Sequence, residues 1–544
     1  MGLSLLHAAL TFLVGIRTVQ AESTSVVDLG YAKYQGTTDG DLKIASFQGI
    51  RYAAPPADKR LSHARTPTVF NNRLTTRVYL EHRPGIHSLS WMMISLKIAY
   101  SLAYTLRICT RKNPFRQLSG FTVEGSIFPQ PIDRNCLRAW VYIHSYIWGA
   151  ASDYNGTELV LESGRNVVAV TIQYRLGVFG QQVKDGGALN AGLLDQDFAL
   201  RWVNKHIRKF GGNPDKVAIW GESAGAGSVI QHIIARDGRT EPQLFRAGIT
   251  SSTYLPPQYL YNDRIPQAIF NEVASQAGCA TGKGEELDCL REIDAALLEE
   301  INLSLIVAGF QGTSIFVPVV DGLFLTQSPT KALSQRKLNG DILLSITNSN
   351  EGFILVNQTW EYDVTEYAQN LFPLLGFKQS KVIASAYQSL GTPLEQVTAI
   401  MGESLFVCPT YLLLEAFPGE SYKSVSMQGE LAIPPGYHGD DLYYYFPSYT
   451  AFPFPRPKTY NNTAFINAFN QGFLSFAANL DPNSKLRPST TPHWRMWSKA
   501  TDLNVEMVFN RTEEGEPWIE ERPSPYALLN RCELWKSLHE LTGQ

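Results

Sequence analysis

The stretch KVAIWGESAGAGSVIQHIIA, Lys216 to Ala235, contains a Gly-x-Ser-x-Gly motif centred on Ser223. The run before the motif predicts a short strand, and the run after it predicts a helix that begins with small residues. A serine on a sharp strand-to-helix turn exposes its Oγ, and small neighbours allow the backbone to turn tightly. The stretch therefore predicts a nucleophile elbow in an α/β fold, with Ser223 as the nucleophile.

Two other Gly-Glu-Ser triplets occur in the chain, ending at Ser404 and Ser421. Ser404 is followed by Leu-Phe and Ser421 by Tyr-Lys, so neither triplet has the second glycine of the motif. Both serines are therefore interpreted as ordinary turn or helix-start residues.

A serine hydroxyl is a poor nucleophile unless an imidazole takes its proton and a carboxylate orients that imidazole. In this kind of fold the chain order is Ser, acid, His. Four histidines follow Ser223: His232, His438, His493 and His539. His232 lies in the helix after the elbow and is expected to face away. His438, in PPGYHGDDLYYYF, lies in a glycine-flanked loop before an aromatic, strand-like run and is the predicted base. The alternative is a solvated turn histidine.

The stretch DILLSITNSNEGF predicts a buried strand, 341–347, that ends in a polar loop carrying Glu351. The carboxyl end of a sheet strand is where the acid of such a site is expected. Asp321, in PVVDG, is the competing candidate, and its other interpretation is a turn residue. Glu351 is preferred because a strand leads directly into it.

From Asn166 onward, short β-branched runs alternate with longer helical patterns, which is typical of an α/β fold with a mostly parallel sheet flanked by helices. Residues 167–174 predict a buried strand and residues 195–212 an amphipathic helix that stops at a glycine pair. No repeat or Gly/Ser linker divides the chain. We expect one domain over residues 22–544.

The 544 residues are 44% hydrophobic and carry a formal net charge of −3. No overall basic field favours nucleic acid, so the expected partner is a small molecule or another protein. The N-terminus has an apolar run, 3–16, followed by small residues up to Ala21. That run is shorter than the roughly 20 residues that span a bilayer. Residues 1–21 are therefore predicted to be a signal peptide, and the protein to be secreted.

Cysteines and glycosylation sequons agree with an oxidising compartment. An even number of cysteines fits disulfide bonds, although spacing alone does not give the pairing. The six cysteines are Cys109, Cys136, Cys279, Cys289, Cys408 and Cys532. Asn-x-Ser/Thr sequons, which mark N-glycosylation sites in secreted proteins, occur at Asn155, Asn302, Asn357, Asn461 and Asn510.

Residues 61–116 differ from the rest, with nine Lys or Arg and a single acidic residue, Glu81. Within them, residues 89–108 are apolar enough to suggest a membrane helix. Lys97 lies in the middle of that run, where a charge opposes insertion by about 2.5 to 3.5 kcal/mol. We therefore expect no stable membrane span.

These motifs closely resemble the type-B carboxylesterase and cholinesterase family of α/β-hydrolases, particularly its secreted fungal members. The similarity covers FQGIRYAAPP (47–56) and nearly everything from residue 148 onward, including NAGLLDQDFALRWV, the SNEGF acid motif and the YHGDDLYY histidine motif. The resemblance implies Ser223 as nucleophile, Glu351 as acid and His438 as base. It also implies that Glu222 shapes the electrostatics of the site, and that the hydroxyl of Ser251 or Ser252 supports the acid.

The family resemblance implies three disulfides: Cys279 with Cys289, Cys408 with Cys532, and Cys109 with Cys136. It also implies an oxyanion hole made partly by glycines after a histidine. In VYIHSYIWGAASDYNG, Ser145 and Tyr146 stand at those positions after His144. The expected donors are therefore the backbone N–H groups of Ala224, Ser145 and Tyr146. A residue with a Cβ is a poor replacement for glycine where the substrate approaches closely.

Residues 61–147 as a whole do not read like an ordinary segment of that family. We interpret them as either a faulty gene model or a diverged insertion. The resemblance implies a secreted serine esterase that forms an acyl-enzyme from a small-molecule ester. Alternatives are a lipase and a catalytically silent, cholinesterase-like binding protein. No metal or organic cofactor is expected, because the cysteines lack zinc-type spacing and no glycine-rich dinucleotide motif follows a strand.

Overall fold

The computed structural model describes residues 25–39, 41–53, 101–107, 137–145, 149–180, 187–417, 425–449, 459–498 and 504–544, with 101–107 described as backbone alone. The predicted signal peptide, residues 1–21, lies outside these ranges, as does most of the atypical segment 61–147.

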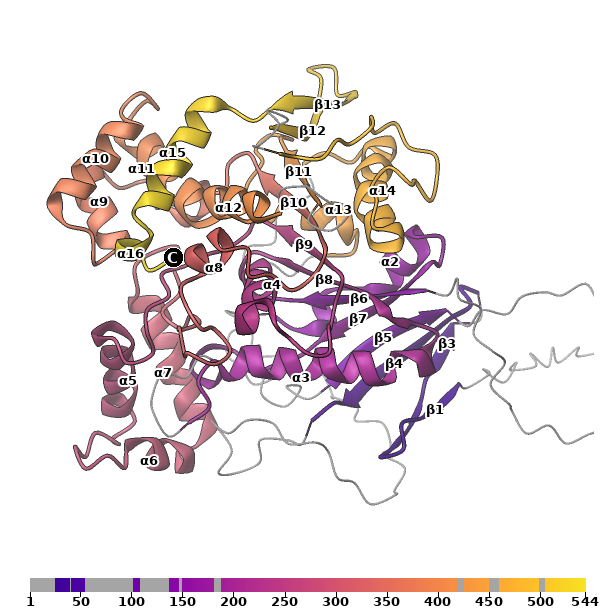
Figure 1. Cartoon of the computed structure of the whole chain (residues 1–544), viewed down its shortest axis with the longest axis horizontal. Coiled ribbons are helices and arrows are strands. Elements are labelled where there is room, and N and C mark those ends of the chain that lie inside the picture. Colours follow the sequence, from indigo (N-terminus) through magenta and orange to yellow (C-terminus); the bar gives the residue numbers. More distant parts are fainter. Residues whose placement is uncertain are drawn as a thin grey trace, which may run out of the picture.

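Eleven strands of the described chain form one sheet in the order β13-β12-β11-β10-β9-β8-β6-β7-β5-β4-β3 (Figure 1). Every pair from β12 through β7 is parallel, and the pairs at both ends of the sheet are antiparallel. The strands are β3 (Thr37–Asp39), β4 (Ile44–Arg51), β5 (Ser101–Arg107), β6 (Arg138–Ile143), β7 (Val167–Ile172), β8 (Asn213–Glu222), β9 (Ala247–Ser251), β10 (Ile342–Asn348), β11 (Val425–Leu431), β12 (Val505–Arg511) and β13 (Pro517–Pro523). A separate hairpin pairs β1 (Val26–Asp28) with β2 (Lys33–Gln35). The mostly parallel sheet predicted from the sequence is confirmed.

Helices cover both faces of the sheet, and successive side chains of each central strand point alternately into two hydrophobic cores. In β6, Val141 and Ile143 face the core under α3 (Ala191–His206), α4 (Ala224–Ile234) and α12 (Cys408–Ala416). Trp140 and Tyr142 face the core under α2 (Gly156–Glu162), α13 (Leu442–Tyr445) and α14 (Thr463–Asn479). Burial on both faces explains why these strands read as continuous apolar runs.

The other helices lie outside these two layers or extend them, and most appear on the left of Figure 1. They are α5 (Arg264–Gln276), α6 (Glu286–Glu292), α7 (Ala295–Ala308), α8 (Pro329–Ser334), α9 (Val364–Leu371), α10 (Phe377–Tyr387), α11 (Pro393–Gly402), α15 (Tyr526–Ser537) and α16 (His539–Thr542). One π-helical turn, Glu403–Val407, joins α11 to α12.

Most predicted elements are confirmed, with one error. β7, β8 and β10 form where strands were expected, and α3 is followed by a short 3-10 turn that ends at the predicted glycine, Gly211. The strand-like run after His438 is instead α13. All four α13 side chains are buried, and the Asp441 carbonyl accepts the Tyr444 N–H at 3.0 Å. A run that is apolar at every position fits a buried helix as well as a strand, so its periodicity could not distinguish the two.

Two of the three expected disulfides are present, Cys279–Cys289 and Cys408–Cys532. The second joins the start of α12 to α15 across 124 residues of sequence. Cys109 and Cys136 lie outside the described residues.

The sequon at Asn302 does not suit glycosylation in the folded protein. Its side chain is only 6% exposed, and its Oδ1 accepts the backbone N–H of Val178 at 2.9 Å. A glycan on that nitrogen has no room between α7 and the loop at Gly177, where an added Cβ would lie 2.3 Å from Asn302 Oδ1. Asn155 and Asn461 are exposed and remain suitable acceptors.

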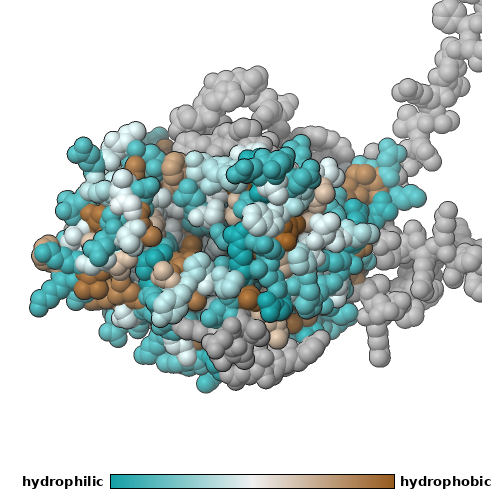
Figure 2. Space-filling view, turned by 90° about the horizontal axis from the view of Figure 1, so that it is seen from above, coloured by the Kyte–Doolittle hydropathy of each residue, from teal (hydrophilic) through white to brown (hydrophobic). Residues whose placement is uncertain are grey.

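One helical run among the described residues, Pro393–Ala416, is long and apolar enough to cross a bilayer, and 78% of its apolar window is buried inside the fold. A core helix passes the same test. Residues 101–107 of the apolar segment 89–108 form strand β5. On the face shown in Figure 2, the described surface is mostly hydrophilic, with apolar side chains in separate groups.

A buried carboxyl on β12 makes the stability of the fold sensitive to pH. Glu506 is 4% exposed and accepts the Tyr411 O–H at 2.9 Å. Burial, and then the negative charge of Glu430, raise the pKa of Glu506 from 4.5 to about 8. The folded state therefore favours the protonated carboxyl, and this contribution to stability is lost as pH rises from about 4.5 through about 8.

We expect Glu506→Gln to leave the free energy of unfolding nearly unchanged at pH 5 and to raise it at pH 9. The amide keeps an oxygen for Tyr411 but carries no charge to bury. The gain at pH 9 should be on the order of 2 to 4 kcal/mol, since each pKa unit corresponds to about 1.4 kcal/mol. Urea unfolding at the two pH values measures it. The control is Glu300→Gln on the exposed side of α7, which should show no such pH-dependent gain. An equal effect of Glu506→Gln at both pH values would contradict the interpretation.

Candidate active site

Ser223 lies on the sharp turn between β8 and α4, as the motif predicts. Its backbone has a φ of 55° and a ψ of −124°, a strained conformation that costs about 1 to 3 kcal/mol. The flanking glycines are required by close backbone contact. A Cβ on Gly221 would lie 2.2 Å from the carbonyl carbon of Gly225, and a Cβ on Gly225 would lie 2.1 Å from the Ile143 oxygen. The turn thus presses the first residues of α4 against the end of β6.

His438 follows β11 and contacts both other predicted residues. Its Nε2 lies 2.8 Å from Ser223 Oγ, and its Nδ1 lies 2.6 Å from Glu351 Oε2. Because a carboxylate can only accept, Nδ1 carries the proton and Nε2 accepts from the serine hydroxyl. The imidazole is 2% exposed and packs 4.5 Å from the Phe406 ring. His438 is therefore buried and held by Glu351, and is not a solvated turn histidine.

Glu351 lies in the turn after β10 and is 2% exposed. Its Oε1 accepts two hydrogen bonds, from the Ser252 hydroxyl at 2.7 Å and from the Asn348 backbone N–H at 2.7 Å. Its Oε2 is therefore left for His438. These bonds fix the carboxylate in one orientation.

The structure separates the two serines that the sequence left as alternatives. Ser252 contacts Glu351, whereas Ser251 Oγ accepts the Trp220 Nε1–H at 3.2 Å and lies 3.3 Å from the Tyr445 hydroxyl. Ser252 has a φ of 54°, a left-handed value that is strained for a residue other than glycine.

Three buried carboxylates surround the imidazole. Glu222 Oε1 lies 3.5 Å from His438 Nε2, and Asp441 lies in the turn just after His438. Burial lowers the pKa of His438, but the hydrogen bond and charge of Glu351 and the charges of Glu222 and Asp441 raise it more. The net pKa lies above 6.5, so the site stabilises an imidazolium.

Of the expected oxyanion donors, Ala224 begins α4 directly after Ser223, and Ser145 is buried just beyond the end of β6. Tyr146 lies outside the described residues.

His144 is fully buried, stacks on Tyr174 with ring centres 4.8 Å apart, and places its Nδ1 2.9 Å from the Ser145 carbonyl. Burial lowers the pKa of His144 to about 4, so this ring is neutral.

The competing candidates lie elsewhere. Ser404 is in the π-helical turn before α12. Asp321 accepts backbone N–H groups of its own turn and the Asn190 amide. His232 Nε2 lies 3.0 Å from Gln196 Oε1. Ser421 falls outside the described ranges.

Two polar residues of the site, Asn348 and Asp441, were missed in the sequence. Asn348 ends a strand whose other residues are mostly apolar, and Asp441 follows His438 by three positions. A polar residue at the carboxyl end of a buried strand was the available signal. In the part of the chain that the structure describes, no group of three or more His, Cys, Asp or Glu side chains is placed to hold a metal ion.

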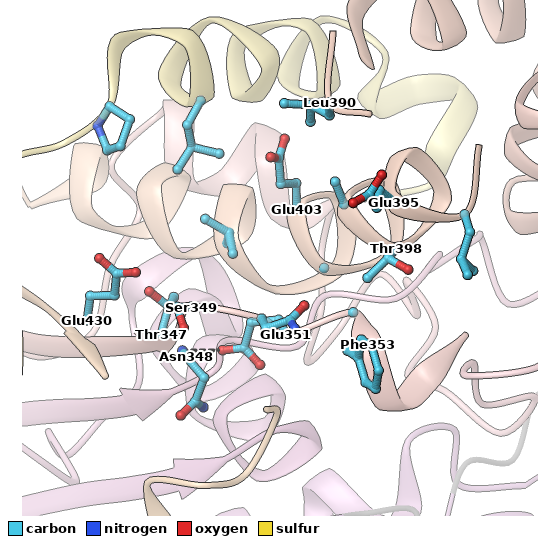
Figure 3. A pocket seen from close by; sticks show the side chains of 18 of the residues that line it. Thr347, Asn348, Ser349, Glu351, Phe353, Leu390, Glu395, Thr398, Glu403 and Glu430 are labelled. Carbon is cyan, nitrogen blue, oxygen red and sulfur yellow. Dashed lines mark hydrogen bonds between the residues drawn. The ribbon is translucent and has the colours of Figure 1, made fainter. Parts of the chain in front are cut away.

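A cavity of about 770 Å³ lies behind the turn that carries Glu351 (Figure 3). Its lining includes Asn348, Ser349 and Glu351 on one side, and Thr398 and Glu403 from the helices on the other. The cavity is lined by Glu351 but not by Ser223 or His438.

Residues 223, 252, 351 and 438 follow β8, β9, β10 and β11, four adjacent parallel strands. The carboxyl ends of parallel strands meet at one edge of the sheet, which is where sites form in α/β folds. A serine on a strained strand-to-helix turn at that edge defines the class as an α/β-hydrolase.

Comparisons with known proteins place the chain within that class. The profile described as "Carboxylesterase family" matches residues 23–516. The chain belongs to the carboxylesterase family and is a carboxylic ester hydrolase.

Similar proteins include fungal lipases and esterases. A "Secreted lipase" of Arthroderma benhamiae is 27% identical, over 73% of this chain and 77% of the relative. "Carboxylesterase patB" of Penicillium expansum is 25% identical, over 81% of this chain and 86% of the relative. The crystal structure of Aspergillus niger EstA superposes with a TM-score of 0.78 at 25% identity, covering 96% of this chain and 99% of that one.

Proposed function

We propose that this protein is a secreted serine carboxylesterase in which Ser223 is the nucleophile, His438 the general base and acid, and Glu351 the residue that orients His438. The observation that carries the proposal is the continuous chain of contacts Ser223 Oγ–His438 Nε2 (2.8 Å) and His438 Nδ1–Glu351 Oε2 (2.6 Å). Both distances suit hydrogen bonds that transfer a proton and hold the base.

In the acylation half-reaction, Ser223 Oγ attacks the ester carbonyl carbon while His438 Nε2 takes the hydroxyl proton. The carbonyl oxygen becomes an oxyanion, which the Ala224 N–H meets at the start of α4, where the helix dipole also favours negative charge. Backbone N–H groups of Ser145 and Tyr146 are the other proposed donors. The imidazolium returns the proton to the departing alcohol, which leaves an acyl-enzyme on Ser223.

In the deacylation half-reaction, His438 removes a proton from water, and the resulting hydroxide attacks the acyl carbonyl. The tetrahedral intermediate collapses, Ser223 recovers its proton from His438, and the carboxylic acid leaves. The charges of Glu351, Glu222 and Asp441, which raise the pKa of His438, stabilise the imidazolium in both half-reactions. No metal or cofactor takes part in either step.

Secretion belongs to the same proposal. It is supported by the N-terminal apolar run, the two disulfides and the relatives named as secreted. Disulfides of this kind persist in oxidising compartments.

The test is hydrolysis of p-nitrophenyl acetate by the purified protein, followed at the millisecond scale. We expect one equivalent of p-nitrophenol per active site in an initial burst, then steady turnover, because an acyl-enzyme forms before water attacks it. Diethyl p-nitrophenyl phosphate should stop turnover by adding a single diethylphosphoryl group to Ser223, seen in the peptide mass spectrum. A folded protein that gives neither burst nor label would be the silent binding protein instead.

A lipase is the second candidate, and the relatives named as lipases favour it. Emulsified tributyrin and triolein distinguish the two. An esterase prefers dissolved short-chain esters and loses rate with chain length, whereas a lipase gains rate when the substrate forms an interface.

A further inference from the structure

Asn348 lies at the centre of a buried hydrogen-bond network behind the imidazole. It is the last residue of β10, is 2% exposed, and donates its backbone N–H to Glu351 Oε1 at 2.7 Å (Figure 3). Its side-chain Nδ2 lies 3.1 Å from Ser252 Oγ and 3.2 Å from Asp441 Oδ1. One residue thus contacts Glu351, Ser252 and Asp441.

The direction of each bond follows from the number of protons available. Ser252 has one hydroxyl proton, and it is used on Glu351 Oε1, so Ser252 can only accept from Asn348. Ionised Asp441 also only accepts. An amide nitrogen carries two hydrogens, so Asn348 can satisfy both acceptors at once. The resulting chain runs from Asp441 through Asn348 and Ser252 to Glu351.

We propose that Asn348 is a positioning residue of the proposed esterase site, because its two amide hydrogens lock the Ser252 hydroxyl toward Glu351 and tie the buried Asp441 carboxylate to the same network. The inference rests on the function proposed above. The hydrogen bonds of Asn348 run to Glu351, Ser252 and Asp441, so it acts through these residues.

Loss of the Asn348 amide should affect both ends of this series of hydrogen bonds, Glu351 and Asp441. Without a donor at its oxygen, the Ser252 hydroxyl is free to rotate away from Glu351. Burial raises the pKa of Asp441 to about 6, and the hydrogen bond from Asn348 opposes that rise. Without this bond Asp441 holds its proton to higher pH, its charge near His438 is lost, and the pKa of His438 falls.

Other ionisable groups also face Asp441 and His438. Glu351 acts on both Asp441 and His438, and Glu222 of β8 acts on His438. Tyr445 of α13 and Tyr142 of β6 lie close enough for Asp441 to raise their pKa further above 10, so both stay neutral. The titrations of His438 and Asp441 are therefore coupled, and the measured acidic limb belongs to the pair.

The test is the pH profile of kcat/KM for p-nitrophenyl acetate in Asn348→Leu, a variant of similar shape that has no donor. We expect kcat/KM at its plateau to fall about 10- to 100-fold, the usual effect of a hydrogen bond to a charged group. The acidic limb of the profile, where kcat/KM falls as pH falls, should move to lower pH. A less basic His438 stays neutral in more acidic solution. In an Asp441→Asn background, Asn348→Leu should no longer move the limb.

Asn339→Leu is the matched control for a structural effect. Asn339 is also a buried asparagine that donates twice, to the carbonyls of His232 and Ala235, but it lies outside the network. It should lower the melting temperature without moving the limb. An unchanged limb in Asn348→Leu, or an equal shift in Asn339→Leu, would overturn the inference. Wild-type turnover that survives loss of Ser223 would instead overturn the proposed function, so the two failures are distinct.

Discussion

Replacing Ser223 by alanine should lower kcat for p-nitrophenyl acetate by about 10⁴- to 10⁶-fold, the range seen when a serine nucleophile is removed from such a triad. The chemistry requires an oxygen 2.8 Å from His438 Nε2, and alanine has none. The fold should be unaffected, because alanine keeps the Cβ and faces the same strained turn as serine. Initial rates and thermal unfolding of the two proteins check both statements.

Ser404→Ala is the matched control, because Ser404 follows the same Gly-Glu pair. Its side chain is 1% exposed, and its Oγ has no hydrogen-bond partner among the described residues. Removal of that hydroxyl should leave turnover unchanged. A Ser223→Ala protein with wild-type rates, or an inactive Ser404→Ala protein, would refute the assignment of the nucleophile.

Glu351→Gln should lower kcat by about 10⁴-fold, as amide substitution of the orienting acid does in other Ser-His-acid triads. The bonds at Oε1 explain why. Ser252 and Asn348 both donate there, so the amide oxygen of glutamine must take that position. Its NH₂ group then faces His438 Nδ1, which must accept. The imidazole proton moves to Nε2, and this protonated nitrogen cannot accept the hydroxyl proton of Ser223.

Asp321→Asn is the control for the second prediction, because Asp321 was the competing acid. It accepts three backbone N–H groups and the Asn190 amide, all near its own turn. We expect some loss of stability and full specific activity. ¹H NMR of the imidazole N–H protons should show the change of tautomer in Glu351→Gln alone. If that variant keeps its rate, Glu351 is not the orienting acid.

The sequence predicted the elements of the site well where the constraint is local. The Ser223 turn is specified by neighbours a few positions away: Gly221 and Gly225 are needed because any Cβ there meets backbone atoms within 2.2 Å. The strands before Ser223 and Glu351 were visible as short apolar runs between polar loops. Local patterns failed at residues 442–445, where an apolar run suits both a helix and a strand.

What the sequence determined by itself, then, is the class of fold, the strand-to-helix turn at Ser223 and the candidates for nucleophile, acid and base, since each depends on residues close together in the chain. Only the tertiary structure decided how they combine. His438 meets Glu351 across 87 positions and Ser223 across 215, because parallel pairing brings the ends of β8 to β11 to one edge. The same pairing placed Ser252, and not Ser251, beside Glu351, whereas the packing of α7 against the loop at Gly177 buried the Asn302 sequon. Such contacts depend on strand order and packing, which no local pattern encodes.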